Sequence, residues 1–303
     1  MEKEMTLHEY FAASSNQSKQ LRDKWERRGV HVPLLMSANI SRYCDMNCRS
    51  CLRDHIEMTE QEHYQPQITV HEWERVFREA EGLGVRFLFL MGGKPLRCKE
   101  ILKRLRYFDK MVFSVFTNGT LMDEEHLQLF KAYPHISPLL NLAGCVGTES
   151  TPHSKGSHLY GSLMAGMSWL MHREIPYGAH AVMTGKNYLQ LLDTGFLIEL
   201  IRRKCETVIY MENGQGELSS EERIYVVERI KELRILFPEI QLWFRPREDK
   251  VEASSMAAGE RFLQVTHQGY VEPHRMSGLA RKNIREAPLE EILRDDIYER
   301  GII

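Results

Sequence analysis

The sequence lacks a run of about eighteen apolar residues, which is the length that a membrane-spanning helix needs. It also lacks an excess of either charge, since 40 basic side chains stand against 42 acidic ones. This balance gives no indication of a nucleic-acid partner or of a basic membrane-binding surface. The charged start, Met1 to Glu4, is unlike a signal peptide. We therefore expect a soluble, cytoplasmic protein with no nucleic-acid or membrane partner.

Cysteine is scarce, with six residues in the chain and none after Cys205. Three of the six, Cys44, Cys48 and Cys51, follow one another with the spacing C-x3-C-x2-C. Three thiols cannot all pair as disulfides, and nothing indicates secretion. Tetrahedral zinc would need a fourth ligand, for which His55 is the nearby candidate. An iron–sulfur cubane with one open iron fits the trio better, and zinc stays the alternative.

Short apolar runs alternate with amphipathic segments from Leu34 onwards, which predicts strands and helices in turn. A charged helix is expected first, at 7–28. The predicted strands are 34–39, 87–90, 111–116, 137–142, 179–184 and 207–211, and the predicted helices between them are 70–81, 99–107, 123–133, 160–172 and 193–204. A repeat of about thirty residues is typical of right-handed βα crossovers around a parallel sheet. The expected fold class is α/β, a partial (β/α)6 TIM-like barrel with its sites at the carboxyl ends of the strands.

The pattern changes after the sixth predicted strand. A charged helix at 219–236 is followed by a strand at 240–244, a hairpin of 262–265 with 270–272, and a last helix at 289–300. We therefore expect three parts. Residues 1–33 form a helix and lead-in, residues 34–215 form the barrel core, and residues 216–303 form a small α+β extension.

Three unusual segments follow the first three strands. The cysteine loop follows the first, Met91-Gly92-Gly93-Lys94-Pro95 the second, and Thr117-Asn118-Gly119-Thr120 the third. Because the carboxyl ends of parallel strands meet at one edge, these segments should converge. Gly92 and Gly93 would let the backbone approach a ligand closely, and Pro95 would fix the turn. Asn118 would either approach the same ligand or only form an Asn-Gly turn.

With this cysteine spacing and these segments, the sequence resembles the radical S-adenosylmethionine superfamily. The resemblance implies one [4Fe-4S] cluster on Cys44, Cys48 and Cys51, with S-adenosylmethionine on the open iron. A reduced donor such as flavodoxin or ferredoxin would supply one electron for its cleavage. The resulting 5′-deoxyadenosyl radical would abstract a hydrogen atom from a substrate, which the resemblance leaves unknown. It implies cofactor contacts at Gly92, Gly93, Lys94, Pro95, Asn118 and Asn141.

One residue departs from the pattern of this family, in which the glycine element is usually Gly-Gly-Glu-Pro and its carboxylate receives the methionyl amino group. Here Lys94 stands in place of the acid. Two positive groups about 4 Å apart repel by roughly 1 kcal/mol in water and by several-fold more in a drier site. Lys94 therefore turns away, or binds the methionyl carboxylate, or S-adenosylmethionine binds weakly or not at all. The alternative hypothesis is a degenerate homologue that holds a cluster and has a binding or regulatory role.

Two residues are candidates for catalysis, Cys145 and His180. His180 and Thr184 share one face of the fifth strand and would line the cavity, although a lone histidine is more often a hydrogen-bonded core residue. Cys145 lies just past the fourth strand, where its default role is that of a small apolar side chain. Glu212, at the end of the sixth strand, is a weaker candidate for substrate contact.

The C-terminal segment carries a second resemblance. Gly269-Tyr270-Val271-Glu272-Pro273-His274 is similar to the Gly-Asp-Val-Glu-Pro-Cys hairpin of superfamily members with a SPASM or twitch extension. The cysteines that hold an auxiliary cluster there are replaced here by Ser255, His274 and Ser277. The resemblance implies an extension that keeps its fold without the metal. Packing would then hold it, through Phe262, Leu263, Val265, Val271 and Met276.

Overall fold

The computed structural model describes residues 15–45, 67–142, 156–212, 218–246, 262–273 and 282–298. The chain divides into two compact units. Of the described residues, the first unit holds 15–45, 67–115, 262–273 and 282–298, and the second holds 116–142, 156–212 and 218–246. Strand β3 (Val112–Thr117) begins in the first unit and ends in the second.

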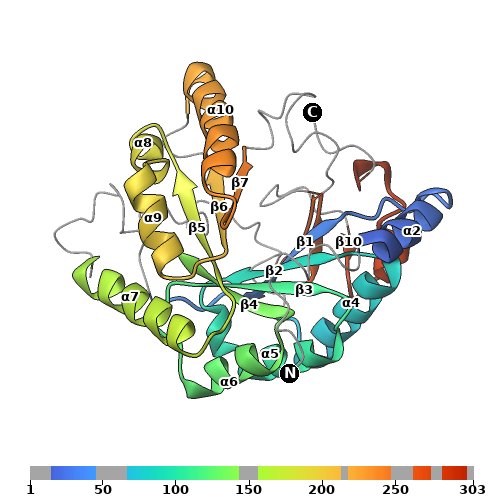
Figure 1. Cartoon of the computed structure of the whole chain (residues 1–303). Helices are drawn as coiled ribbons and strands as arrows, with labels where there is room; N and C mark the ends of the chain where they lie inside the picture. Colours follow the sequence, from blue (N-terminus) through green and yellow to red (C-terminus); the bar gives the residue numbers. More distant parts are fainter. Residues whose placement is uncertain are drawn as a thin grey trace. The chain divides into compact units, whose positions relative to one another are not determined.

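The sheet of the first unit has the strand order β10-β9-β8-β1-β2-β3 (Figure 1). Its strands are β1 (Leu35–Ser41), β2 (Phe87–Gly92), β3, β8 (Phe262–Val265), β9 (Tyr270–Glu272) and β10 (Lys282–Asn283). Strands β8, β1, β2 and β3 run parallel, whereas β8, β9 and β10 form an antiparallel meander. Strand β1 therefore has a parallel neighbour on each side.

Helix α4 (Val70–Leu83) covers one face of these strands (Figure 1). It begins with a capping box, in which the Thr69 hydroxyl accepts from the Glu72 amide and the Glu72 carboxylate accepts from the Thr69 amide. It ends at Gly84, whose φ of 97° favours glycine. Phe77 is fully buried and meets the ring of Phe113 on β3 edge-to-face, with 5.7 Å between centroids.

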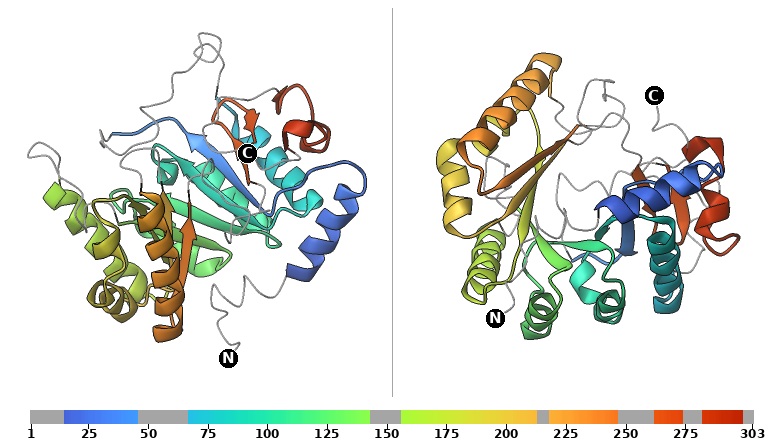
Figure 2. Two further views of the ribbon diagram at one scale, coloured as in Figure 1. Left: turned by 90° about the horizontal axis from the view of Figure 1, so that it is seen from above. Right: turned by 45° about the vertical axis from the view of Figure 1, so that its right-hand side comes forward.

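The remaining helices of the first unit are shorter. They are α2 (Ser15–Glu26), η2 (Pro95–Arg97), α5 (Lys99–Arg104), η3 (Leu105–Tyr107), α11 (Leu289–Ile292) and η5 (Asp296–Tyr298). In the views of Figures 1 and 2, α2 and the C-terminal helices lie beside α4. No helix in the described part of the chain is both long enough and apolar enough to span a bilayer.

In its described residues, the second unit repeats a helix–strand order four times. Its parallel strands follow the order β4 (Ile136–Asn141), β5 (Gly178–Met183), β6 (Thr207–Glu212) and β7 (Gln241–Arg245). Its helices are α6 (Glu124–Ala132), α7 (Gly156–His172), α8 (Tyr188–Leu191), α9 (Thr194–Arg202) and α10 (Ser220–Leu236). Helices α7, α9 and α10 lie on the same side of these strands (Figure 2).

The predicted fold class is confirmed as α/β, with a mostly parallel sheet of the partial-barrel type that does not close among the described residues. All six predicted strands are present, and so is the C-terminal hairpin, now β8 and β9. The expected helix at 7–28 is described from Ser15, where α2 begins, and its earlier part lies outside the described residues. Leu263, Val265 and Val271 are buried, as expected of residues that hold the C-terminal segment by packing.

The predicted last helix, 289–300, is wrong in its length. Helix α11 ends at Ile292, and a separate 3-10 turn follows at Asp296–Tyr298. The Asp295 carboxylate accepts a hydrogen bond from the Ile297 amide at 3.1 Å, which gives the backbone a local alternative to the helical ladder. Acidic side chains are also unfavourable at a helix carboxyl end.

Candidate active site

The first predicted cluster ligand, Cys44, lies three residues beyond the end of β1. Its thiol is free and partly exposed. Just before it, the register of β1 against β2 is shifted between Asn39 and Ser41, so the strand is already irregular where the loop begins. Cys48 and Cys51 lie outside the described residues, as do Cys145, Ser255, His274, Met276 and Ser277.

The two glycines after β2 fit against this loop. Gly92 has a φ of 126°, and the Gly93 amide donates to the Ser41 carbonyl oxygen at 2.7 Å. A Cβ atom on Gly93 would lie 1.9 Å from the Tyr43 carbonyl oxygen and 2.9 Å from the Cβ of Cys44. No side chain fits in that space. In the described part of the chain, the close backbone approach expected from these glycines is therefore made to the cysteine loop.

Lys94 is buried at the same place. Its side chain is 6% exposed, and its Nζ lies 3.1 Å from Oδ1 of Asp45, whose side chain is 46% exposed. Lys94 is therefore not a surface lysine, because its ammonium group is buried in the protein and meets a carboxylate of the cysteine loop. Asp45 was not among the site residues predicted from the sequence. The available signal was an acid within the cysteine motif, together with a lysine at the position where the family usually has an acid.

A cation–π contact joins the same two segments. Pro95 begins the short helix η2, and the guanidinium carbon of Arg97 on this helix lies 3.6 Å from the centroid of the Tyr43 ring. Sequence reasoning also missed this pair, because an exposed tyrosine and an exposed arginine carry no signal of contact until the fold brings them together.

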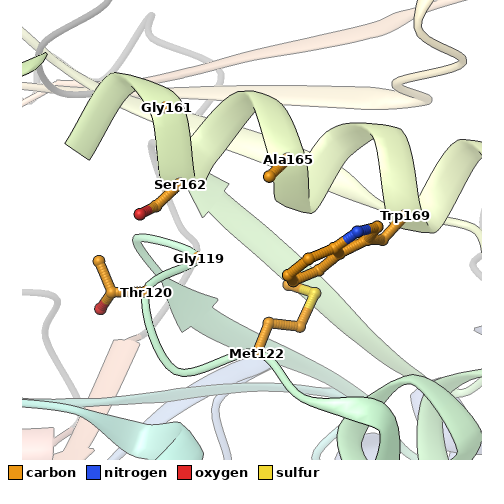
Figure 3. A pocket seen from close by; sticks show the side chains of 7 residues that line it. All are labelled: Gly119, Thr120, Met122, Gly161, Ser162, Ala165 and Trp169. Atoms are coloured by element: carbon orange, nitrogen blue, oxygen red, sulfur yellow. The ribbon is translucent and has the colours of Figure 1, made fainter. Parts of the chain in front are cut away.

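The turn after β3 closes on itself in the second unit. Oδ1 of Asn118 accepts from the amide of Thr120 at 3.2 Å and from its hydroxyl at 2.8 Å, and Gly119 has a φ of 82°. These are the features of an Asn-Gly turn, and an approach of Asn118 to the cofactor stays a prediction. Behind the turn is a depression of about 330 Å³. Figure 3 shows its lining of Gly119, Thr120, Met122, Gly161, Ser162, Ala165 and Trp169.

His180 and Asn141 are neighbours across the sheet. They are register partners on β5 and β4, so their side chains project from the same face. His180 is 7% exposed, and its ring lies 4.5 Å from that of Phe116 at an angle of 47°. Thr184 lies past the end of β5, where its hydroxyl accepts from the Lys186 amide. His180 therefore packs as a core residue beside the predicted cofactor residue Asn141.

Glu212 does not present its carboxylate to a substrate. Its side chain is fully buried, and both oxygens receive the guanidinium of Arg223, at 2.7 and 3.1 Å. The Leu218 amide also donates to it. Bidentate pairing of this kind fixes α10 to the end of β6, so the interpretation of Glu212 as a substrate contact is replaced by a structural one.

The comparison with known families decides the assignment. The family model described as the radical SAM superfamily matches residues 38–194, more than half of the chain. The chain belongs to the radical SAM superfamily. The cofactors expected from the sequence, a [4Fe-4S] cluster and S-adenosylmethionine, are those of this superfamily.

Solved structures of radical SAM proteins share the fold. SuiB of Streptococcus suis, in its structure with bound S-adenosylmethionine, is 16% identical over 92% of this chain and 70% of its own, with a TM-score of 0.67. Its structure with the precursor peptide SuiA gives a TM-score of 0.69 at 15% identity, over 93% of this chain and 69% of SuiB. A third structure, anSMEcpe with bound AdoMet and the Cp18Cys peptide, is 13% identical over 88% of this chain and 81% of its own, with a TM-score of 0.62. At these identities the likeness shows the fold alone.

The described residues of this radical SAM protein fit a cluster loop. Cys44 offers a free thiol directly after the first strand, and the glycine turn after the second strand leaves no room for a side chain beside it. A thiolate is the ligand that iron–sulfur clusters take from proteins. Asp45 balances the positive charge of Lys94 next to this thiol.

Proposed function

We propose that this protein is a radical SAM enzyme with one [4Fe-4S] cluster, held by Cys44, Cys48 and Cys51. When bound and reduced by a donor such as flavodoxin or ferredoxin, the cluster would supply one electron for the reductive cleavage of S-adenosylmethionine, which would give methionine and a 5′-deoxyadenosyl radical. The protein itself binds and orients S-adenosylmethionine and the substrate, and it excludes water from them, because the difficult chemistry belongs to the cofactors. Gly92, Gly93, Lys94, Pro95, Asn118 and Asn141 are the proposed cofactor-binding residues. A reducing compartment such as the cytoplasm suits such a cluster.

The pairing of Lys94 with Asp45 carries this proposal. The case for a degenerate homologue combined the missing auxiliary-cluster cysteines with an ammonium group at Lys94 that would repel the amino group of S-adenosylmethionine, and the structure bears on the second point. In the structure that ammonium group is 3.1 Å from a carboxylate. An ion pair has no net charge, so its field at a neighbouring group falls well below that of a single cation. Lys94 is therefore compatible with a bound sulfonium cofactor.

Anaerobic reconstitution tests the proposal directly. The reconstituted protein should bind about four irons and four sulfides per chain, as one cubane. With dithionite and S-adenosylmethionine it should form 5′-deoxyadenosine. A variant with Cys44, Cys48 and Cys51 replaced by Ala is the control and should lose both the iron and the product.

Three results would contradict parts of the proposal. Stoichiometric zinc without iron would remove the cluster assignment. About eight irons per chain would contradict the single cluster. If the protein bound four irons but formed no 5′-deoxyadenosine, the result would favour the degenerate homologue with a binding or regulatory role. This holds whether or not S-adenosylmethionine binds.

A further inference from the structure

Three contacts of different kinds join the start of the cysteine loop to the turn after β2. A backbone hydrogen bond runs from Gly93 to Ser41 at 2.7 Å, an ion pair joins Lys94 to Asp45 at 3.1 Å, and Arg97 stacks on Tyr43 at 3.6 Å. All three belong to the first unit. We call this set the loop clamp, and its members are Ser41, Tyr43, Asp45, Gly93, Lys94 and Arg97.

The ion pair of the loop clamp differs from the other lysine pairs in its burial. The side chain of Lys94 is 6% exposed, whereas that of Lys103, which pairs with Glu100 at 3.0 Å on α5, is 43% exposed. A buried ammonium group has a large cost of desolvation, which only a well-placed partner offsets. Lys94 therefore constrains Asp45 strongly, while an exposed pair such as Lys103–Glu100 constrains its partners little.

The constraint acts on the residue next to a proposed metal ligand. Asp45 follows Cys44 directly, and Tyr43 precedes it, so two members of the loop clamp flank the cysteine. Gly93 brings the opposite backbone so close that a Cβ there would lie 2.9 Å from the Cβ of Cys44. Cys44 is thus held from both sides by contacts among protein groups.

We propose that Lys94 is a positioning residue that, through Asp45, holds Cys44 ready to ligate the cluster. The proposal rests on the proposed function for its final step, the binding of the cluster. Its first step, the coupling of the two loops, is a property of the protein without metal. A ligand held in place before binding loses less conformational freedom when the metal arrives, so the cluster should assemble faster and be retained longer.

The metal-free protein provides the first test, which does not depend on a cluster. Asp45→Asn removes the charge of the partner, and the readout is hydrogen exchange of the Gly93 amide, which donates to Ser41 across the two loops. Exchange should speed up by about tenfold, the change expected for the loss of one charge-assisted contact. Lys103→Met is the matched control and should leave this amide unchanged. Equal exchange of the Gly93 amide in Asp45→Asn and the unmodified protein would overturn the proposal.

The reconstituted protein provides the second test. Lys94→Met keeps a long side chain without the charge. In this variant a chelator should remove the cluster several-fold faster, as followed by the cluster absorbance. The control Lys103→Met should lose its cluster at the rate of the unmodified protein. Reversing the pair, with Asp45→Lys and Lys94→Asp together, should recover part of the retention, which a general loss of stability would not predict. Equal retention in Lys94→Met and the unmodified protein would overturn the inference and leave the proposed function intact. Absence of any cluster in the unmodified protein would overturn the proposed function, and the exchange test would still decide on the loop clamp.

Discussion

Arg285 and Glu72 lie 213 positions apart in the sequence and form a bidentate ion pair, with contacts of 2.5 and 3.1 Å. Glu72 also caps α4, and Arg285 also donates to the Gln67 carbonyl oxygen. One carboxylate thus fixes the first turn of α4 and the C-terminal segment together. The Leu289 amide adds a second connection, since it donates to the Glu79 carboxylate at 2.8 Å.

Replacing Arg285 by Met should loosen this attachment. The pair is about three-quarters buried and bidentate, so its loss should cost about 1 kcal/mol and lower the melting temperature by about 2–4 °C. Hydrogen exchange should rise in residues 282–292. The control is Arg78→Met, which removes a single contact with Glu74 on the same helix from an arginine that is 66% exposed, and it should change little. Equal effects of the two substitutions would show that the connection is no stronger than a surface pair.

The same pair predicts a dependence on pH. The hydrogen bond from Arg285 lowers the pKa of Glu72 from 4.5 to about 2, with the Thr69 backbone and hydroxyl contributing. A carboxyl whose pKa is lower in the folded state stabilises the fold above its unfolded pKa. The stability difference between the unmodified protein and Glu72→Gln should therefore be constant above pH 4.5 and shrink as the pH falls toward about 2. Urea unfolding at several pH values measures it, and a difference that grows on acidification would contradict the assignment.

The pair of Glu212 with Arg223 should be the most costly to break in the second unit. Arg223→Met leaves a fully buried carboxylate without its cation, which costs about 3–5 kcal/mol. Glu212→Gln should cost less, because the amide oxygen still accepts one hydrogen bond from Arg223, and the cation left without its partner is 17% exposed rather than fully buried. The matched control on the same helix is Arg229→Met, whose partner Glu232 is 63% exposed. It should change the free energy of unfolding by less than about 1 kcal/mol.

Two glycines should respond in opposite directions to the same substitution. Gly93→Ala places a Cβ 1.9 Å from the Tyr43 carbonyl oxygen, so the cysteine loop must shift and iron uptake should fall. A Cβ on Gly82, inside α4, meets nothing within 4 Å. Gly82→Ala should therefore stabilise the protein by about 0.5–1 kcal/mol and leave the iron content unchanged. Iron analysis and thermal unfolding of both variants check this, and normal iron in Gly93→Ala would refute the steric argument.

Alkylation of the metal-free protein should distinguish its cysteines. Burial raises the pKa of Cys205 from 9.0 to about 12, and it also raises the pKa of Cys98. Since the thiolate is the reactive form, Cys205 should stay unmodified by iodoacetamide at pH 8. Cys44 and Cys98 are both partly exposed, but the Cys98 thiol donates to the Ile40 carbonyl oxygen and has a raised pKa, so Cys44 should react before it. Peptide mass analysis gives the order, with urea-unfolded protein as the control in which the three react alike.

The sequence predicted the elements of this fold well because their signals are local. The apolar run Phe87–Leu90 indicated a buried strand, and the amphipathic segment 70–81 indicated a helix, and both are present. The pair Asn118-Gly119 likewise indicated a turn, and the structure has a turn there. The convergence of the segments after β1 and β2 also follows from local signals, since it depends only on the order of parallel strands.

Contacts between distant side chains were not predictable in the same way. Lys94 was recognised as an anomaly, but its partner Asp45 was not, because the pairing depends on how two loops are set by separate strands. Glu212 was a candidate for substrate contact from the sequence, but its carboxylate forms an ion pair with Arg223 on the following helix. The pairing of β8 with β1 had no sequence signal either, since an apolar four-residue strand does not specify its neighbour.

That pairing has a consequence for the order in which the protein can fold on the ribosome. Strand β1, which leads into the cysteine loop, obtains one neighbour from β2 early in synthesis and the other from β8, more than two hundred residues later. Contacts of such large sequence separation form slowly, and an unpaired strand edge can associate with other chains meanwhile. The surroundings of Cys44, the first proposed cluster ligand, are therefore completed only late in translation. If the metal were inserted into a nascent chain, this would happen before β8 pairs with β1, the strand that leads into the cysteine loop.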